Sequence, residues 1–119
     1  MADMEMRLEL NYRLDFYGPL LTDHRQELMR LYCEEDLTQQ EIAEQMDITR
    51  QGVFDAIAKS KKQLMEYERK LGLVARYRAL SASAESCLEA LGTLRPSPED
   101  APALDRAKVA LESMLRDKI

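Results

Sequence analysis

The sequence predicts an all-α fold with a helix-turn-helix as its central element. Only four Gly and four Pro occur in 119 residues, and strong helix formers dominate the rest. Thr38 and Glu41 stand three residues apart, which is the spacing of a capping box at the start of a helix. Apolar residues then recur at helical spacing on both sides of a short break at Asp47-Ile48. Together these features predict two helices joined by a tight turn.

The second of these helices is expected to begin at Arg50, with Thr49 as its N-cap, and to end at Gly72. One stripe of this helix, about 100° wide, is expected to face the core: Val53, Ala56, Ile57, Ser60, Leu64, Tyr67 and Leu71. In the shorter helix before it, Ala43 is small enough for a second helix to cross closely. An ordinary pair of packed helices is the alternative, but the cap, the small residue, the turn and the stripe agree on a helix-turn-helix.

Further helices are expected over residues 4–17, 23–33, 74–91 and 100–117. We therefore assign residues 1–73 to the helix-turn-helix domain and residues 74–119 to a C-terminal extension of amphipathic helices. Gly72-Leu73 closes the first part, with Leu73 placed for the hydrophobic contact that accompanies such a cap. The C-terminal helices need a surface to cover, and a second copy of the chain, giving a homodimer, is favoured over packing on the chain's own first domain.

Charge is distributed unevenly along the chain. The net charge of −5 argues against nonspecific polyanion binding by the whole molecule. Residues 47–78 nevertheless carry 8 basic and 4 acidic side chains, a net of +4, whereas residues 1–46 have a net charge of −7 and residues 79–119 of −2. The positive segment is the proposed recognition helix and its continuation. This favours nucleic acid as a ligand, although a solvated helix face has a similar composition.

The outward face of the second helix carries the candidate DNA-binding residues. They are its N-terminal residues and the lysines that follow: Thr49, Arg50, Gln51, Lys59, Lys61 and Lys62. At such positions an arginine can bond bidentately to guanine and a glutamine to adenine, while lysines meet phosphates.

An apolar strip is expected on the same face, formed by Phe54, Ala58 and Met65. Such a strip more often contacts protein, either another helix of the chain or a partner. Asp55 stands beside it, and its carboxylate would repel phosphate and accept a hydrogen bond only from a cytosine amino group. Both DNA and a protein partner therefore remain candidate ligands of this face.

Nothing in the sequence predicts an enzyme, a metal site or a cofactor. His24 is the only histidine, and it stands at the expected start of a helix as a surface residue. There is no Gly-rich phosphate loop, no Cys/His cluster spaced for zinc and no serine on a nucleophile elbow. The run Glu34-Glu35-Asp36 is expected to be a solvated acidic turn rather than a cation site. Cys33 and Cys87 are expected to be small buried hydrophobes rather than a disulfide.

The expected location of the protein is the cytoplasm. No run approaches the roughly 20 apolar residues that span a bilayer. The N-terminal sequence lacks the basic region and apolar run of a signal peptide.

Four stretches carry a resemblance to a known family: Asn11–Thr22, Asp36–Glu44, Thr49–Asp55 and Tyr67–Leu73. On these stretches the chain resembles the YlxM family of small bacterial helix-turn-helix proteins, itself similar to the DNA-reading region four of sigma factors. The resemblance implies an all-α fold with a winged-helix-like or sigma-region-four-like three-helix core. Asp47 departs from the glycine that is usual in helix-turn-helix turns.

The resemblance also implies a place in protein targeting. Genes of the family commonly neighbour those of the signal recognition particle (SRP) GTPase and its receptor, and the family is regarded as a regulator or accessory of that pathway. We therefore predict a DNA-binding regulatory protein that takes part in the SRP pathway. The alternative is an accessory module that does not bind DNA and contacts the SRP GTPase or SRP RNA.

Overall fold

The computed structural model describes residues 2–116, and every regular element in that range is helical. The elements in order are α1 (Ala2–Tyr17), the 3₁₀ helix η1 (Gly18–Leu20), α2 (Asp23–Cys33), α3 (Gln39–Met46), α4 (Arg50–Leu71), α5 (Leu73–Gly92) and α6 (Ala101–Arg116). The predicted all-α fold is confirmed. The helices form two compact units, which divide between Val74 and Ala75.

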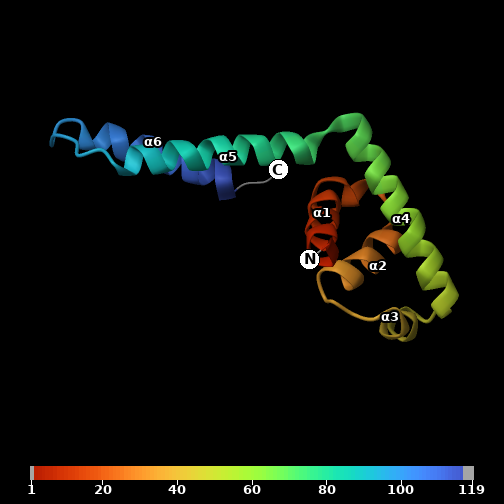
Figure 1. Ribbon diagram of the computed structural model, residues 1–119. Coiled ribbons are helices and arrows are strands. Elements are labelled where there is room, and N and C mark those ends of the chain that lie inside the picture. The colour runs from red at the N-terminus through yellow and green to blue at the C-terminus, as the bar shows by residue number, and fades with distance from the viewer. Residues whose placement is uncertain (1, 117–119) are drawn as a thin grey trace. The chain divides into compact units, whose positions relative to one another are not determined.

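In the first unit, α4 packs against α1, α2 and α3, which lie along one side of it (Figure 1). The buried side chains between them come from all four helices: Leu14, Tyr17, Leu28, Met29, Leu31, Ile42, Ala43, Val53, Ile57 and Leu64. The apolar stripe predicted for α4 is buried as far as Leu64, but Leu71 is 56% exposed. Leu73, at 41%, also stays largely outside the core. The expectation for Leu71 was wrong, because α4 ends at this residue and the chain turns so that Val74 fills the core instead.

The helix-turn-helix is formed by α3, a turn and α4, and side chains define each boundary. Thr38 Oγ1 accepts the N–H of Glu41 at 3.1 Å, and the Glu41 carboxylate accepts the N–H of Thr38 at 3.0 Å. The bond from the Thr38 N–H holds the pKa of Glu41 below its usual value. Asp47 takes the left-handed conformation, φ 55°, that glycine adopts most easily. Thr49 Oγ1 then accepts the N–H of Gly52 at 2.9 Å and begins α4.

A polar network joins α1 to the junction between α4 and α5. Tyr17 is 1% exposed. Its hydroxyl donates to Glu68 Oε1 at 2.6 Å and accepts the N–H of Leu73 at 3.0 Å. The same carboxylate oxygen accepts the N–H of Val74 at 3.0 Å. Gly72 links the two helices with φ 63°, a conformation that strains a residue carrying Cβ. A side chain of α1 therefore fixes a turn 56 residues later.

Ser60 of α4 is fully buried, and its hydroxyl has no hydrogen-bond partner among the described residues. An unpaired buried hydroxyl costs about 1–3 kcal/mol. We therefore expect Ser60→Ala to raise the free energy of unfolding by about 1 kcal/mol, which urea denaturation would measure. Ser83→Ala, at an exposed position of α5, controls for helix propensity alone. A Ser60→Ala protein less stable than wild type would contradict this reasoning.

In the second unit, α5 and α6 form an antiparallel hairpin (Figure 1), in which the Tyr77 hydroxyl lies 3.5 Å from the carbonyl oxygen of Leu115. Most of the less exposed positions recur every three or four residues and define the hairpin seam: Tyr77, Ser81, Ala84, Leu88 and Leu91 on α5, and Ala101, Leu104, Lys108, Leu111 and Leu115 on α6. Ala84 is the only fully buried residue among the described residues of this unit. The hairpin therefore has a very small core of its own.

The two cysteines lie in different environments. Cys33 is half-buried, and burial raises its pKa to about 11, so the thiol is protonated at neutral pH. Cys87 is exposed. The expectation that both cysteines are buried was therefore wrong for Cys87, which stands one residue before Leu88 and so points away from the hairpin seam.

Candidate nucleic-acid interface

The side of α4 that faces away from the core is exposed. We call this surface the outer face of α4, and its residues are Arg50, Gln51, Phe54, Asp55, Ala58, Lys59, Lys61, Lys62 and Met65. It is held outward because Val53, Ile57 and Leu64 anchor the opposite side of the helix. The remaining predicted residue, Thr49, is exposed at the N-cap. The candidate residues therefore share one accessible surface, and their contact with DNA stays a prediction.

The centre of the outer face is uncharged, and cations stand on its flanks. At about 100° per residue, the central positions are Gln51, Phe54, Ala58 and Met65. The flanking cations are Arg50 and Lys61 on one side and Lys62 and, further round, Lys59 on the other, where the carboxylate of Asp55 stands between the two lysines. An uncharged centre with cations on both flanks suits a recognition helix, because base edges lie in the middle of the groove and phosphates lie on both sides of it.

Some of these side chains are engaged within the first unit. Gln51 Nε2 donates to Asp55 Oδ1 at 3.0 Å, one helical turn away. Lys61 Nζ lies 5.4 Å from the centre of the Tyr32 ring, a cation–π contact that ties this lysine to α2. Arg50, by contrast, makes no ion pair or hydrogen bond with the described residues. It is therefore the cation at the start of α4 that is most available to a ligand.

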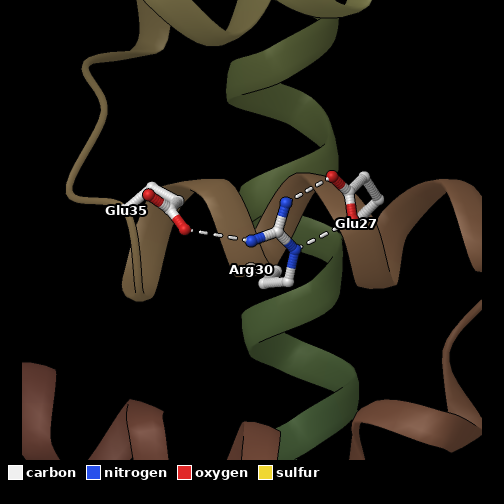
Figure 2. A network of polar contacts seen from close by, with 3 residues as sticks. All are labelled: Glu27, Arg30 and Glu35. Atoms are coloured by element: carbon white, nitrogen blue, oxygen red, sulfur yellow. Dashed lines mark hydrogen bonds and ion pairs between the residues drawn. The ribbon is translucent and has the colours of Figure 1, made fainter.

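The acidic loop before α3 is paired with arginines. Arg30 donates to Glu27 through Nη2 and Nε at 2.7 and 3.0 Å, and to Glu35 through Nη1 at 3.1 Å (Figure 2). Arg7 Nη1 donates to Asp36 Oδ1 at 2.6 Å. The Arg30 bond lowers the pKa of Glu27. These carboxylates are thus partly neutralised, and no group of three or more His, Cys, Asp or Glu within residues 2–116 is arranged to hold a metal ion.

The sequence reasoning did not find these arginine pairs. Glu27 and Arg30 stand three residues apart on one helix, so their spacing could have revealed that pair. Arg7 and Asp36 are 29 residues apart and come from different elements, and no local signal connects them.

Comparison with known proteins decides the family. A family model described as "Putative helix-turn-helix protein, YlxM / p13 like" (UPF0122) matches residues 4–94. The chain belongs to this family. The match spans α1 to α5, including the helix-turn-helix and the outer face of α4. The predicted resemblance is confirmed.

Individual UPF0122 proteins match over most of their length. The chain is 37% identical to one from Desulforamulus reducens over 112 residues, which cover 92% of this chain and 93% of the relative. It is 38% identical to one from Halalkalibacterium halodurans over 96 residues, with 81% and 88% covered. It is 40% identical to one from Symbiobacterium thermophilum over 99 residues, with 83% and 88% covered. No solved structure matches the chain.

Within residues 2–116 of the UPF0122 chain, no helix combines the length and the apolar character that crossing a bilayer requires.

Proposed function

We propose that this UPF0122 protein is a DNA-binding regulatory protein whose recognition helix is α4. The observation that carries the proposal is the exposed outer face of α4, with an uncharged centre and cations on both flanks. It lies in residues 47–78, whose net charge is +4 while the flanking segments are negative. In helix-turn-helix proteins the start of the second helix enters the major groove and its side chains meet base edges. Thr49, Arg50 and Gln51 occupy that start, and Lys59 and Lys62 are placed for phosphates.

The proposed regulatory role is in the SRP protein-targeting pathway, and the proposed location is the cytoplasm. The support is the resemblance to the YlxM family, whose genes commonly neighbour those of the SRP GTPase and its receptor. A helix-turn-helix protein encoded in such a neighbourhood would act on the promoter of its own operon.

A mobility-shift titration with that promoter DNA tests the proposal. The wild-type protein should bind, and Arg50→Ala combined with Lys62→Ala should weaken binding by tenfold or more. The reason is that a bidentate base contact provides about 1–3 kcal/mol and the lysine adds one phosphate contact. Arg25→Ala combined with Lys70→Ala removes the same charge from α2 and from the C-terminal end of α4, outside the outer face, and should have little effect. Equal binding by wild type and the Arg50/Lys62 variant would rule the site out.

The second candidate function is an accessory module that contacts the SRP GTPase or SRP RNA without binding DNA. It is favoured by the apolar strip on the outer face, where Phe54 is 55% and Met65 51% exposed. Purified GTPase, SRP RNA and promoter DNA can be offered to the immobilised protein side by side. Capture of GTPase or RNA without DNA would establish this function in place of the first, and capture of neither would discard it.

We further propose that the protein is a homodimer joined through the α5–α6 hairpin. An isolated helical hairpin with so small a core is marginal in water. Large apolar side chains nevertheless remain exposed on it: Leu80 is 48%, Leu94 55% and Met114 52% exposed. A second copy that covered these side chains would supply the missing core.

Two stripes of exposed apolar positions run along one side of the hairpin. On α5 and just beyond it they are Leu80, Cys87 and Leu94, at intervals of seven residues, and on α6 they are Ala103, Ala107, Ala110 and Met114. Within the two helices each stripe position precedes a seam position by one residue. The residue that precedes a seam position turns to the same side of the hairpin in both helices, because the helices are antiparallel. The two stripes therefore lie on one side of the hairpin. Two hairpins joined through that side would form a four-helix bundle, in which the alanines allow close approach.

Sedimentation equilibrium tests the dimer. Wild type should have twice the 13.7 kDa mass of one chain, and Leu80→Asp with Ala107→Glu should be monomeric, because each charge would be buried in the interface. Val109→Glu is the control, since Val109 is 62% exposed but follows the seam residue Lys108 and so points to the other side. A monomeric wild-type protein would contradict the proposal and leave the hairpin to pack on its own chain.

A further inference from the structure

We propose that the outer face of α4 recognises thymine, through contact of Phe54 and Ala58 with 5-methyl groups in the major groove. The inference rests on the proposed DNA binding and goes beyond it by naming the base that the helix prefers. Thymine is the one base that presents an apolar group in the major groove, and alanine and phenylalanine side chains are suited to contact it.

The two side chains are spaced for base pairs that lie two steps apart. Phe54 is 55% exposed, and Ala58 is exposed one turn further along the same line of the helix. Four residues of α-helix span about 6 Å, close to the height of two stacked base pairs at about 3.4 Å each. The pair can therefore meet the methyl groups of two thymines that are separated by one base pair, without a change of helix geometry.

The charges around these residues favour DNA over a protein partner. Arg50 and Lys62 stand on opposite flanks of the apolar centre, so that cations border it on both sides, as the two phosphate backbones border a groove. Met65 lies eleven residues beyond Phe54, about 16 Å along the axis, whereas the N-terminal residues of a recognition helix are the ones that contact base edges. Only the Phe54–Ala58 part of the strip can therefore reach base edges.

A neighbouring hydrogen bond favours the same base pair. Asp55 Oδ1 accepts one of the two Nε2 hydrogens of Gln51 at 3.0 Å, which restrains the rotation of that amide. The second Nε2 hydrogen and Oε1 have no partner among the described residues. The free hydrogen of Nε2 can donate to N7 of adenine, and Oε1 can accept from the amino group of adenine. Adenine is the base that pairs with thymine. Asp55 is thus a positioning residue for Gln51, and the apolar and polar contacts both select A·T pairs.

The test compares promoter DNA with the same duplex in which every thymine is replaced by uracil. Uracil keeps all hydrogen-bonding groups and lacks only the methyl group. We expect wild type to bind the uracil duplex about tenfold more weakly, since each buried methyl group contributes about fourfold in affinity. Phe54→Ala with Ala58→Ser should bring the ratio of the two affinities close to one. Met65→Ala, on the same line of α4 but beyond its N-terminal part, should keep the wild-type ratio.

Three results would overturn the inference. Equal binding of both duplexes by wild type would refute thymine recognition while leaving DNA binding intact. A tenfold ratio that persists in the Phe54/Ala58 variant would show that the methyl groups act through DNA shape rather than through this strip. Binding of neither duplex would remove the proposed DNA-binding function itself, and the inference with it.

Discussion

Replacing Tyr17 with phenylalanine is expected to lower the free energy of unfolding by about 2 kcal/mol. The substitution keeps the buried ring but removes the hydroxyl that donates to Glu68 and accepts from the Leu73 N–H. Both partners lie in a partly buried site, where leaving a polar group unpaired costs about 1–3 kcal/mol. Urea denaturation followed by circular dichroism measures the difference. Tyr32→Phe is the control, because the Tyr32 hydroxyl has no hydrogen-bond partner among the described residues.

The same hydroxyl predicts a loss of stability at alkaline pH. Burial and, after it, the hydrogen bond to Glu68 raise the pKa of Tyr17, so folding favours the neutral phenol. Its contribution is complete below about pH 10, the pKa of an unfolded tyrosine, and is lost as pH rises through the folded pKa. Stability should fall less steeply above pH 10 in Tyr17→Phe than in wild type. Parallel pH profiles for the two proteins would contradict the assigned role of the network.

Truncating Ile42 to alanine is expected to cost about 3 kcal/mol, the largest effect predicted for a single residue. Ile42 is fully buried in the core where α3 meets α4, and its loss leaves a cavity as well as less buried apolar surface. Phe54→Ala removes a larger side chain, but from a position that is 55% exposed. It should change the free energy of unfolding by no more than about 0.5 kcal/mol. Similar losses in the two variants would refute the assignment of inner and outer faces.

The sequence predicted the helix-turn-helix closely because its determinants are local. The capping box joins Thr38 to Glu41 and the cap of α4 joins Thr49 to Gly52, each over three residues. Gly72 marks the end of α4 in the same local way. Periodicity also placed the side of α4 that faces the core. It failed at Leu71, because a helical wheel does not show where the neighbouring helices stop covering the stripe.

Contacts between distant segments could not be predicted in this way. Tyr17 meets Leu73 across 56 residues, and no periodic pattern connects them. At the candidate interface, the sequence indicated which residues of α4 face outward. It did not indicate that Lys61 is held by Tyr32, which comes from α2 and meets it only in the folded chain. Gln51 and Asp55 are four residues apart, a spacing that makes side chains neighbours on a helix. Their hydrogen bond could therefore have been predicted from the sequence.

The salt dependence of DNA binding tests most directly whether the outer face of α4 contacts phosphates. The logarithm of the association constant for promoter DNA, measured by fluorescence anisotropy, should fall linearly with the logarithm of salt concentration. Lys59→Ala combined with Lys62→Ala should make that slope shallower by about 2, because each phosphate contact contributes about 0.9. Arg25→Ala with Lys70→Ala should keep the wild-type slope. A slope that is the same in wild type and in the Lys59/Lys62 variant would contradict the assignment of α4 as the recognition helix.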